Sequence, residues 1–197
     1  MKPIEDAGEL FRRQRAVRAW SDREVDDETV RAVLQAAIHA PSGSNTQPWS
    51  FIVVRDPEQK VRIREVYDEA REDISQIARV APVSSEDDRQ PLDAAPVLIV
   101  ACVRTPPSGR AGFQTGASIY PACQNLMLAA RALGLGTVLT TLHRRRKDEL
   151  HEVLGIPEGI ESAAIIPLGW PTRDYGPNRR APLDNVVMHE RWTESPT

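Results

Sequence analysis

The chain has 197 residues, the length of one ordinary domain or two small ones, and 41% of them are hydrophobic and 27% charged. This composition excludes a wholly disordered chain, and a fold of this size needs no disulfide or metal to hold it together. Basic and acidic residues number 25 and 28, so the net charge of −3 argues against a protein held to nucleic acid by phosphate neutralisation.

The chain also lacks the marks of a membrane or secreted protein. Its longest apolar stretch, residues 97–103, is far shorter than the roughly 20 residues that cross a bilayer. The first ten residues are charged and lack the apolar core of a secretory signal. We therefore expect a cytoplasmic protein with no membrane partner, in which Cys102 and Cys123 are small buried residues.

Apolar residues at helical spacing predict a helix over residues 4–15 and a second helix that begins after Asp26. Asp26 is a typical N-cap, and acidic residues follow it where the helix dipole favours them. Pro41 and Gly43 end this second helix. Its apolar stripe consists of Val30, Val33, Leu34, Ala37 and Ile38.

The middle of the chain alternates between strands and charged helix. A polar loop at residues 41–48 leads into a predicted strand at 49–54, and residues 57–79 predict a weakly amphipathic helix. Residues 81–96 are polar and contain three prolines, which indicates an exposed connection. The apolar run at 97–103 predicts the second strand.

A long helix follows, buried on a broad face, with Pro121 near its first turn, where a missing N–H costs least. Residues 134–141 predict a turn and a strand, 147–154 a short helix, and 163–168 a last core strand. The tail beyond Gly169 contains four prolines and little periodicity. We expect it to lie extended over another surface, such as a second subunit.

Long helices between the strands place the chain in the α+β or α/β class, as a single domain over residues 1–197. No P-loop, nucleophile-elbow, zinc-protease or EF-hand motif is present. A helix precedes Gly134 and Gly136 and a strand follows, which rejects a dinucleotide fingerprint and makes Gly134 a helix-ending glycine. The basic run at 144–147 is interpreted as a solvated surface, with a nucleic-acid patch as the alternative. The histidines share no metal-ligand spacing and are interpreted as core or solvated side chains: His39, His143, His151 and His189.

Three segments have unusual local chemistry. Arg15 and Arg18 are three positions apart, so both guanidinium groups can face one phosphate if the turn stays helical. The loop at residues 40–49 combines hydroxyls, amides and prolines and suits the polar edge of a heterocycle. A plain helix-to-strand turn is the alternative for that loop. Arg179 and Arg180 form a further pair able to bind phosphate.

Four motifs resemble the FMN-dependent nitroreductase family, and their order and spacing fit it from Arg12 onward. They are RAVRAW at residues 15–20, APSGSNTQPWSF at 40–51, YPACQNLMLAARALGLGTVLTT at 120–141 and IIPLGWP at 165–171. The resemblance implies an α+β fold with a mixed central sheet flanked by helices. It also implies a homodimer with FMN at the interface and a C-terminal tail that wraps the partner subunit.

The resemblance also implies which residues hold FMN. Arg15, Arg18 and the backbone of Ala16 would meet the phosphate, and Arg179 and Arg180 would close on it from the tail. Thr140 and Thr141 would lie along the flavin ring near N5. The loop residues that would meet the ring or the ribityl chain, some from the partner subunit, are Pro41, Ser42, Gly43, Asn45 and Gln47.

The implied reaction is hydride transfer from NADH or NADPH through FMN to a small acceptor such as a nitroaromatic or a quinone, which requires no acid–base residue. Reductive dehalogenation, consumption of the flavin itself and a non-catalytic flavin carrier or sensor are the alternatives. The sequence departs from the family twice. Ala16 stands where many relatives have serine, and residues 58–93 lack an Asn/Lys pair that many relatives place against the flavin.

Overall fold

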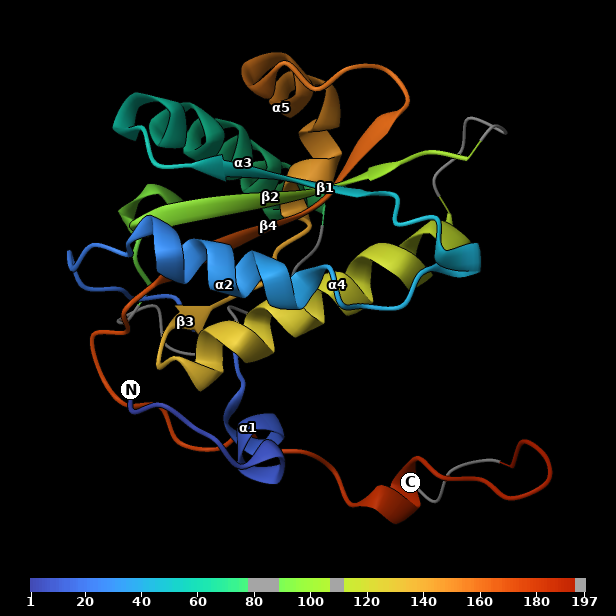
Figure 1. The fold of residues 1–197 in the computed structure, drawn as a ribbon. Helices are drawn as coiled ribbons and strands as arrows, with labels where there is room; N and C mark the ends of the chain where they lie inside the picture. Colours follow the sequence, from blue (N-terminus) through green and yellow to red (C-terminus); the bar gives the residue numbers. More distant parts are fainter. Residues whose placement is uncertain (78–88, 107–111, 194–197) are drawn as a thin grey trace.

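The computed structural model describes residues 1–77, 89–106 and 112–193. The helices in these ranges are α1 (Ala7–Arg13), α2 (Asp27–Ala37), α3 (Pro57–Ile77), α4 (Phe113–Ala132) and α5 (Lys147–Leu154) (Figure 1). The strands are β1 (Trp49–Val54), β2 (Val97–Arg104), β3 (Gly136–Thr137) and β4 (Ile160–Gly169). Short 3-10 turns lie at Gly43–Asn45 (η1), Leu92–Ala94 (η3), Leu142–Arg146 (η4) and Leu183–Asn185 (η5). The expected α+β class is confirmed.

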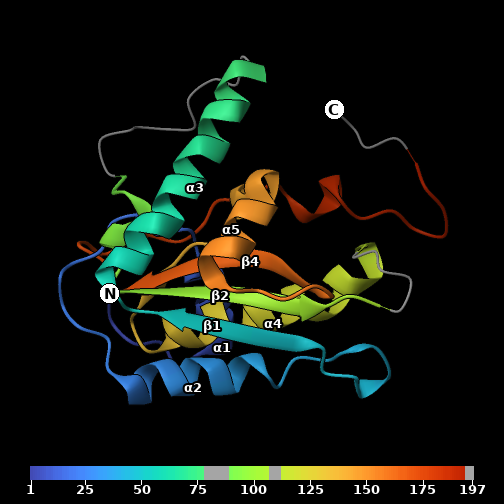
Figure 2. The same cartoon turned by 90° about the horizontal axis from the view of Figure 1, so that it is seen from above.

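The strands form one sheet in the order β1-β2-β4-β3, and their pairings are antiparallel. Figure 2 shows β1, β2 and β4 side by side in this order. In the described ranges, the parallel direction expected of a mixed sheet enters through a single bridge between Ala16 and Thr137, on the free side of β3. The chain leading out of α1 therefore extends the sheet at this edge.

Helices cover both faces of the sheet: α2 and α4 lie on one side, and α3 and α5 on the other (Figure 1). Strand β2 buries both of its faces, because Ile99 and Val103 pack with α2 and α4 whereas Leu98 and Val100 pack with α3 and α5. A strand covered on both faces is apolar at nearly every position, which explains its uninterrupted apolar sequence. Among the described helices, none combines the length and the apolarity that a membrane crossing requires.

Both cysteines are buried and free, as the sequence predicted. Cys102 lies on β2 and Cys123 on α4. Burial raises the pKa of Cys102 to about 11 and that of Cys123 to about 12. Neither side chain is therefore a reactive thiolate near neutral pH.

The second predicted helix is confirmed as α2. The Oδ1 atom of Asp26 accepts a hydrogen bond of 2.7 Å from the N–H of Thr29, which caps the helix as expected. The buried part of the predicted stripe is Val30, Val33 and Ala37. Ile38, which was included in the stripe, is 41% exposed because the helix ends one residue before it.

The first helix is shorter than predicted: α1 does not extend over residues 4–15. Asp6 caps it by accepting a 2.7 Å hydrogen bond from the N–H of Glu9, and Gln14 has extended backbone with φ −67° and ψ 121°. None of the α1 residues is buried. This helix therefore presents no fully buried apolar face to the rest of the molecule.

The prediction that Pro121 lies near a first turn is wrong, because α4 begins at Phe113 and Pro121 is in its interior. Proline has no N–H for the carbonyl four residues earlier, which is that of Ala117. The helix starts early with a cap in which Gly112 N lies 3.4 Å from Thr115 Oγ1. Its first residue, Phe113, is 96% exposed, so no buried stripe marks this start in the sequence.

The remaining helices and strands of the structure are of the type that the sequence predicted. The predicted helix over 57–79 is confirmed as α3 up to Ile77; its end, and residues 81–88 of the predicted connection, fall outside the described residues. Gly134 ends α4 with a positive φ of 90°, as expected. The predicted strand at 134–141 is reduced to β3 and a separate bridge between Thr140 and Ile165.

Two glycines, Gly136 and Gly169, lie directly opposite each other on β3 and β4. A Cβ atom on Gly169 would lie 2.5 Å from Cδ of Pro96 and 2.9 Å from Cδ1 of Trp20. Glycine at this position thus allows the segment that carries Trp20 to pack against the sheet.

We expect Gly169→Ala to lower the free energy of unfolding by about 1–3 kcal/mol, the usual cost of overpacking a core. Urea denaturation at neutral pH measures this loss. Gly176→Ala is the matched control, since nothing lies within 4 Å of the position of its Cβ. Wild-type stability in the Gly169 variant would contradict the close approach of Trp20.

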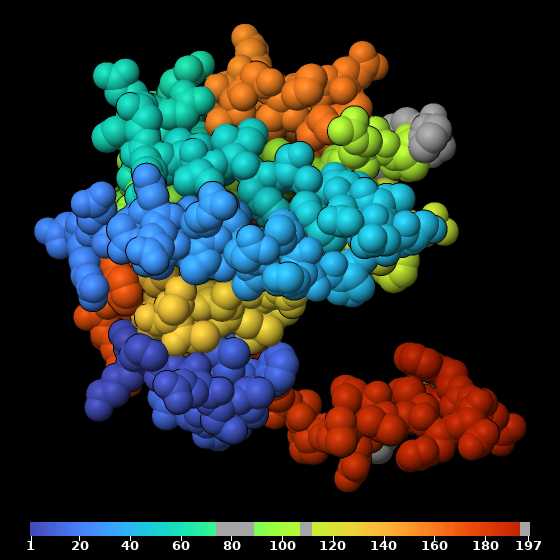
Figure 3. Space-filling view, in the orientation of Figure 1, coloured from blue at the N-terminus to red at the C-terminus, as the bar shows by residue number. Residues whose placement is uncertain are grey.

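The tail beyond β4 leaves the body of the molecule (Figures 1 and 3). Tyr175 is still buried, but past Asn178 the described tail has η5 as its one regular piece. Three of its apolar side chains are largely exposed: Leu183 at 72%, Val186 at 66% and Trp192 at 82%. The tail therefore carries apolar surface that its own chain does not cover.

Candidate functional site

The arginine segment after α1 is extended and not helical. Ala16 bridges to Thr137, and the N–H of Val17 donates a 2.9 Å hydrogen bond to the carbonyl of Thr137. Successive side chains of an extended chain alternate in direction. Arg15 and Arg18 therefore do not share one helix face, which corrects that part of the prediction.

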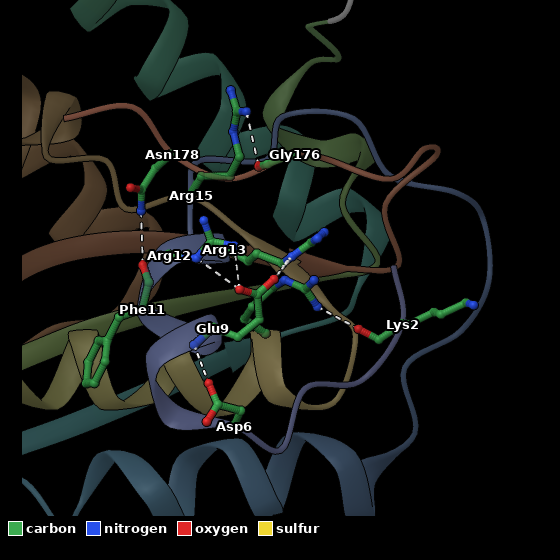
Figure 4. A network of polar contacts seen from close by, with 10 residues as sticks. Lys2, Asp6, Glu9, Phe11, Arg12, Arg13, Arg15, Gly176 and Asn178 are labelled. Atoms are coloured by element: carbon green, nitrogen blue, oxygen red, sulfur yellow. Dashed lines mark hydrogen bonds and ion pairs between the residues drawn. The ribbon is translucent and has the colours of Figure 1, made fainter.

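The two guanidinium groups reach different neighbours. The Nη1 atom of Arg15 lies 3.4 Å from the carbonyl oxygen of Gly176, and its guanidinium carbon lies 5.6 Å from the ring centre of Tyr175 (Figure 4). Arg18 instead lines a cavity of about 130 Å³ together with Thr140. Two predicted cofactor residues 122 positions apart thus meet at one cavity.

The other walls of this cavity come from α3 and from the residues that precede β2. Its remaining lining residues are Trp20, Tyr67, Asp68, Arg71, Arg89, Gln90, Pro91, Leu92, Val138 and Leu139. Sequence reasoning did not identify these residues individually. Tyr67, Asp68 and Arg71 lie within about one turn of α3, beside the face that buries Ile63 and Val66. That spacing is the signal from which they could have been found.

Arg18 has no anionic partner within the described chain. No hydrogen bond or ion pair involves its side chain there, whereas Arg146 and Arg55 form ion pairs with carboxylates. Partial burial lowers the pKa of Arg18, and the nearby charges of Arg89 and Arg15 lower it further. Among the described residues, three arginines (Arg18, Arg71 and Arg89) and one carboxylate, that of Asp68, line this cavity. An excess of positive charge at a cavity favours an anionic ligand.

Gln90 holds the backbone around Arg18. Its N–H donates a 2.9 Å hydrogen bond to the carbonyl of Arg18, and its Oε1 accepts one of 2.7 Å from the N–H of Trp20. These bonds tie the extended segment to the residues that precede β2. The sequence contained no pattern that pointed to this role.

Thr140 is fixed by the sheet. It exchanges two backbone hydrogen bonds with Ile165, of 3.0 and 2.9 Å. Thr141 is exposed, directly precedes η4, and is not among the residues that line the cavity. The structure therefore brings Thr140, but not Thr141, to Arg18.

The polar loop at residues 41–47 is strained. Ser44, Asn45 and Gln47 have positive φ angles of 50°, 54° and 47°. Each such non-glycine residue costs on the order of 1–3 kcal/mol. The loop is held by a 3.0 Å hydrogen bond from the N–H of Gln47 to Oγ of Ser42, and all its side chains except that of Ser42 are exposed. Strain on an exposed, internally bonded loop is typical of a binding segment.

This loop does not reach the cavity within one chain. Its Gly43 N–H lies 3.4 Å from Oγ of Ser118 on α4, whereas Gln14, beside the arginine segment, contacts Met127 further along α4. Nine helical residues separate those contacts, which is roughly 13 Å. The predicted loop residues that do not line the cavity are Pro41, Ser42, Gly43, Asn45 and Gln47.

The two tail arginines lie beside the first arginine segment through their backbone. Asn178, directly before them, donates hydrogen bonds from Nδ2 to the carbonyls of Phe11 (3.0 Å) and Gln14 (3.1 Å) (Figure 4). Arg179 and Arg180 are both exposed, and Arg180 Nη1 donates to the Arg179 carbonyl at 2.8 Å. Their charges are therefore available to a ligand.

The other candidates have structural partners. Arg146 of the basic run binds Asp73 of α3 at 2.7 Å, and Lys147 binds Glu161 at 3.0 Å, so two of these four cations are engaged internally. His143 lies in the core. No group of three or more potential metal ligands was found among the described residues.

Lys60 does not restore the missing Asn/Lys pair. Its Nζ donates hydrogen bonds of 3.0 and 2.9 Å to the carbonyls of Asp93 and Ala95. It is absent from the lining of the cavity. The departure from the family pattern therefore persists in the folded chain.

A phosphorylated flavin fits this arrangement in part. Arg18 offers a cation that forms no ion pair with a described residue, Thr140 lies at the same cavity, and Arg15 lies next to the tail arginines. Sites for ligands of this size usually have volumes of about 300–1,000 Å³. The cavity of about 130 Å³ at Arg18 is smaller than that.

The sequence is similar to known proteins along nearly its whole length. The profile of the Nitroreductase family matches residues 11–170. A protein of Archaeoglobus fulgidus named "Putative NADH dehydrogenase/NAD(P)H nitroreductase" is 33% identical over 194 residues, covering 96% of this chain and 100% of the relative. Iodotyrosine deiodinase 1 of Mus musculus is 34% identical over 195 residues, covering 91% of this chain and 68% of the relative.

The fold is also shared with solved structures. That of oxidized iodotyrosine deiodinase bound to FMN and 3-iodo-L-tyrosine has a TM-score of 0.77 and 25% sequence identity. The match covers 94% of this chain and 99% of that one. Sequence and fold thus point to the same group of proteins.

Proposed function

The chain belongs to the Nitroreductase family, and from this premise we propose that it is an FMN-dependent oxidoreductase that passes hydride from NADH or NADPH to a nitroaromatic or quinone acceptor. The nitroreductase name of one relative and the FMN in the solved structure of another support this reaction and this cofactor. The observation that carries the proposal is the cavity where Arg18, which forms no ion pair with any described residue, lies with Thr140.

In this proposal the chain binds and orients the cofactor. Arg18, Arg15 and the tail arginines hold the phosphate, and the segment at Thr140 and Thr141 lies along the ring. Bound FMN would supply the redox chemistry, taking hydride from the nicotinamide and reducing the acceptor in a ping-pong cycle. Because Thr140 is bonded to β4 through its backbone, its position relative to a bound ring stays fixed.

We further propose that the protein is a homodimer with FMN at the interface. The cavity of one chain is too small for a flavin nucleotide, and the strained loop at residues 41–47 lies away from it. A partner subunit whose loop meets this cavity would complete the site. The exposed apolar tail supplies surface for that association.

We expect the double variant Leu183→Asp and Val186→Asp to dissociate the dimer. Both side chains are largely exposed in the single chain, at 72% and 66%, so the charges cost the isolated fold little. In a dimer that covers them, each buried, unpaired carboxylate would cost several kcal/mol. Light scattering coupled to gel filtration measures the change in mass. Arg191→Asp, at an exposed polar position of the same tail, is the control, and a double variant that stays dimeric would refute the role of the tail.

The function is tested by the visible spectrum of the purified protein. We expect bound yellow flavin, bleaching by NADPH or NADH without oxygen, and recovery of the colour when a nitroaromatic or quinone is added. A colourless protein that takes up no added FMN would overturn the proposal. Bound flavin that neither nicotinamide bleaches would favour a carrier or sensor instead.

Reductive dehalogenation is the second candidate, because a deiodinase is 34% identical over nearly the whole chain. Reduced protein mixed with a halogenated phenol would then release halide, measured with an ion-selective electrode. Halide release without turnover of nitroaromatics would select this candidate over the first.

A further inference from the structure

Asn178 caps α1 from the opposite end of the sequence. The last carbonyls of a helix lack partners within the helix, and Asn178 binds three carbonyls at this end. Its Nδ2 donates to Phe11 and Gln14 at 3.0 and 3.1 Å, and its backbone N–H donates to Arg12 at 2.8 Å (Figure 4). Since α1 has no buried residue, these bonds are a main element of its attachment.

Asn178 is also the last residue of the described tail that hydrogen-bonds to the body of the molecule. The later backbone bonds, such as that from Asn185 to Pro182, stay within the tail. Just before Asn178, the carbonyl of Gly176 accepts the bond from Arg15. Arg179 and Arg180 come directly after it. The amide of Asn178 thus connects the first arginine segment to the second.

We propose that Asn178 is a positioning residue, which holds Arg179 and Arg180 against the segment of Arg15 so that the guanidinium groups converge on one phosphate. This inference rests on the proposed function. Without the hydrogen bonds of Asn178, the tail arginines would belong to a free chain end. Ordering such a chain costs conformational entropy, and this cost would weaken the binding of the ligand.

The test compares FMN with riboflavin, which lacks the phosphate. We expect Asn178→Ala to raise the Kd of FMN about tenfold, as two lost hydrogen bonds predict, and to change that of riboflavin by less than about twofold. Quenching of flavin fluorescence on binding measures both. Asn178→Asp keeps the shape of the side chain but replaces the donor by an oxygen, and it should shift FMN binding in the same direction.

A double-mutant cycle tests the route of the effect. Arg180→Ala should weaken FMN binding in the wild-type background and add little in the Asn178→Ala background. Gln59→Ala is the matched control, because its Nε2 likewise donates to a helix carbonyl, that of Val153, at 2.7 Å. This control should leave the ratio of the FMN and riboflavin constants unchanged.

The outcomes separate the two proposals. If Asn178→Ala weakens the binding of FMN and of riboflavin equally, Asn178 is merely structural and the inference is overturned. An unchanged Kd of FMN in this variant would also overturn it. So would full additivity of the effects of Asn178→Ala and Arg180→Ala on FMN binding. A wild-type protein that binds neither flavin would overturn the proposed function itself. Because riboflavin binding needs the folded site, it also shows that the Asn178 variants are folded.

Discussion

Replacing Arg18 by alanine should weaken FMN binding by about tenfold to a hundredfold, because a charge-assisted hydrogen bond to an anion contributes about 1.5–3 kcal/mol. The variant should leave the free energy of unfolding of the ligand-free protein unchanged. The Arg18 side chain has no partner in the described chain, and Arg89 and Arg15 repel it. Titration with FMN measures the affinity, and urea denaturation of the ligand-free protein measures the stability.

Arg31→Ala is the matched control, since Arg31 is an exposed arginine on the outer face of α2, away from the cavity. It should change neither quantity. If Arg18→Ala binds FMN as tightly as the wild type, the arginine motif is structural and the cavity is not a phosphate site. A large loss of stability in the ligand-free variant would point to the same conclusion.

The second large effect concerns acid stability and depends on His143. This side chain is fully buried; its Nε2 lies 3.2 Å from the carbonyl oxygen of Ser162, and its Nδ1 has no partner in the described structure. Burial lowers the pKa of His143 to about 4. The neighbouring His151 accepts a 3.3 Å hydrogen bond from the N–H of Ser162, and burial lowers its pKa as well.

We expect the free energy of unfolding to fall by about 3 kcal/mol between pH 7 and pH 4 through His143 alone. The unfolded chain binds a proton on this histidine below about pH 6.5, whereas the folded chain binds it only near pH 4. Protons therefore favour the unfolded state throughout this window, and stability rises with pH. Urea denaturation at a series of pH values measures the slope.

His143→Gln separates this contribution from the carboxylates that also titrate in acid. Glutamine keeps a neutral donor for the Ser162 carbonyl, so the variant should show a flatter profile between pH 4 and 6.5. His39→Gln, at an exposed position after α2, should retain the wild-type slope. Identical slopes in wild type and His143→Gln would contradict a histidine that stays neutral in the folded core.

The sequence predicted most of the elements because their signals are local. Asp26 marks the start of α2, Gly134 ends α4, and the apolar run at 97–103 indicates the buried strand β2. Four motifs together identified the family, the loop at residues 40–49 most specifically, because each is a short, contiguous run of residues. The sequence did not predict the bounds of α1 or the start of α4, because these helix ends are exposed and no buried stripe marks them.

The arrangement of the site depended on contacts between distant segments. The sequence could not show that the chain leaves α1 at Arg13 and runs along β3, which separates Arg15 from Arg18. Nor could it place Gln90 beside Arg18 or Asn178 beside Gln14, since each pair joins residues more than 70 positions apart.

By itself, then, the sequence determined the fold class and the family, and it predicted the segments of the candidate site. Only the tertiary structure decided which of them share a cavity and which lie away from it. The physical reason is that helix caps, turns and apolar periodicity act over a few residues, whereas a binding cavity forms where separate elements pack together. Its charges converge only after the core has fixed their distances.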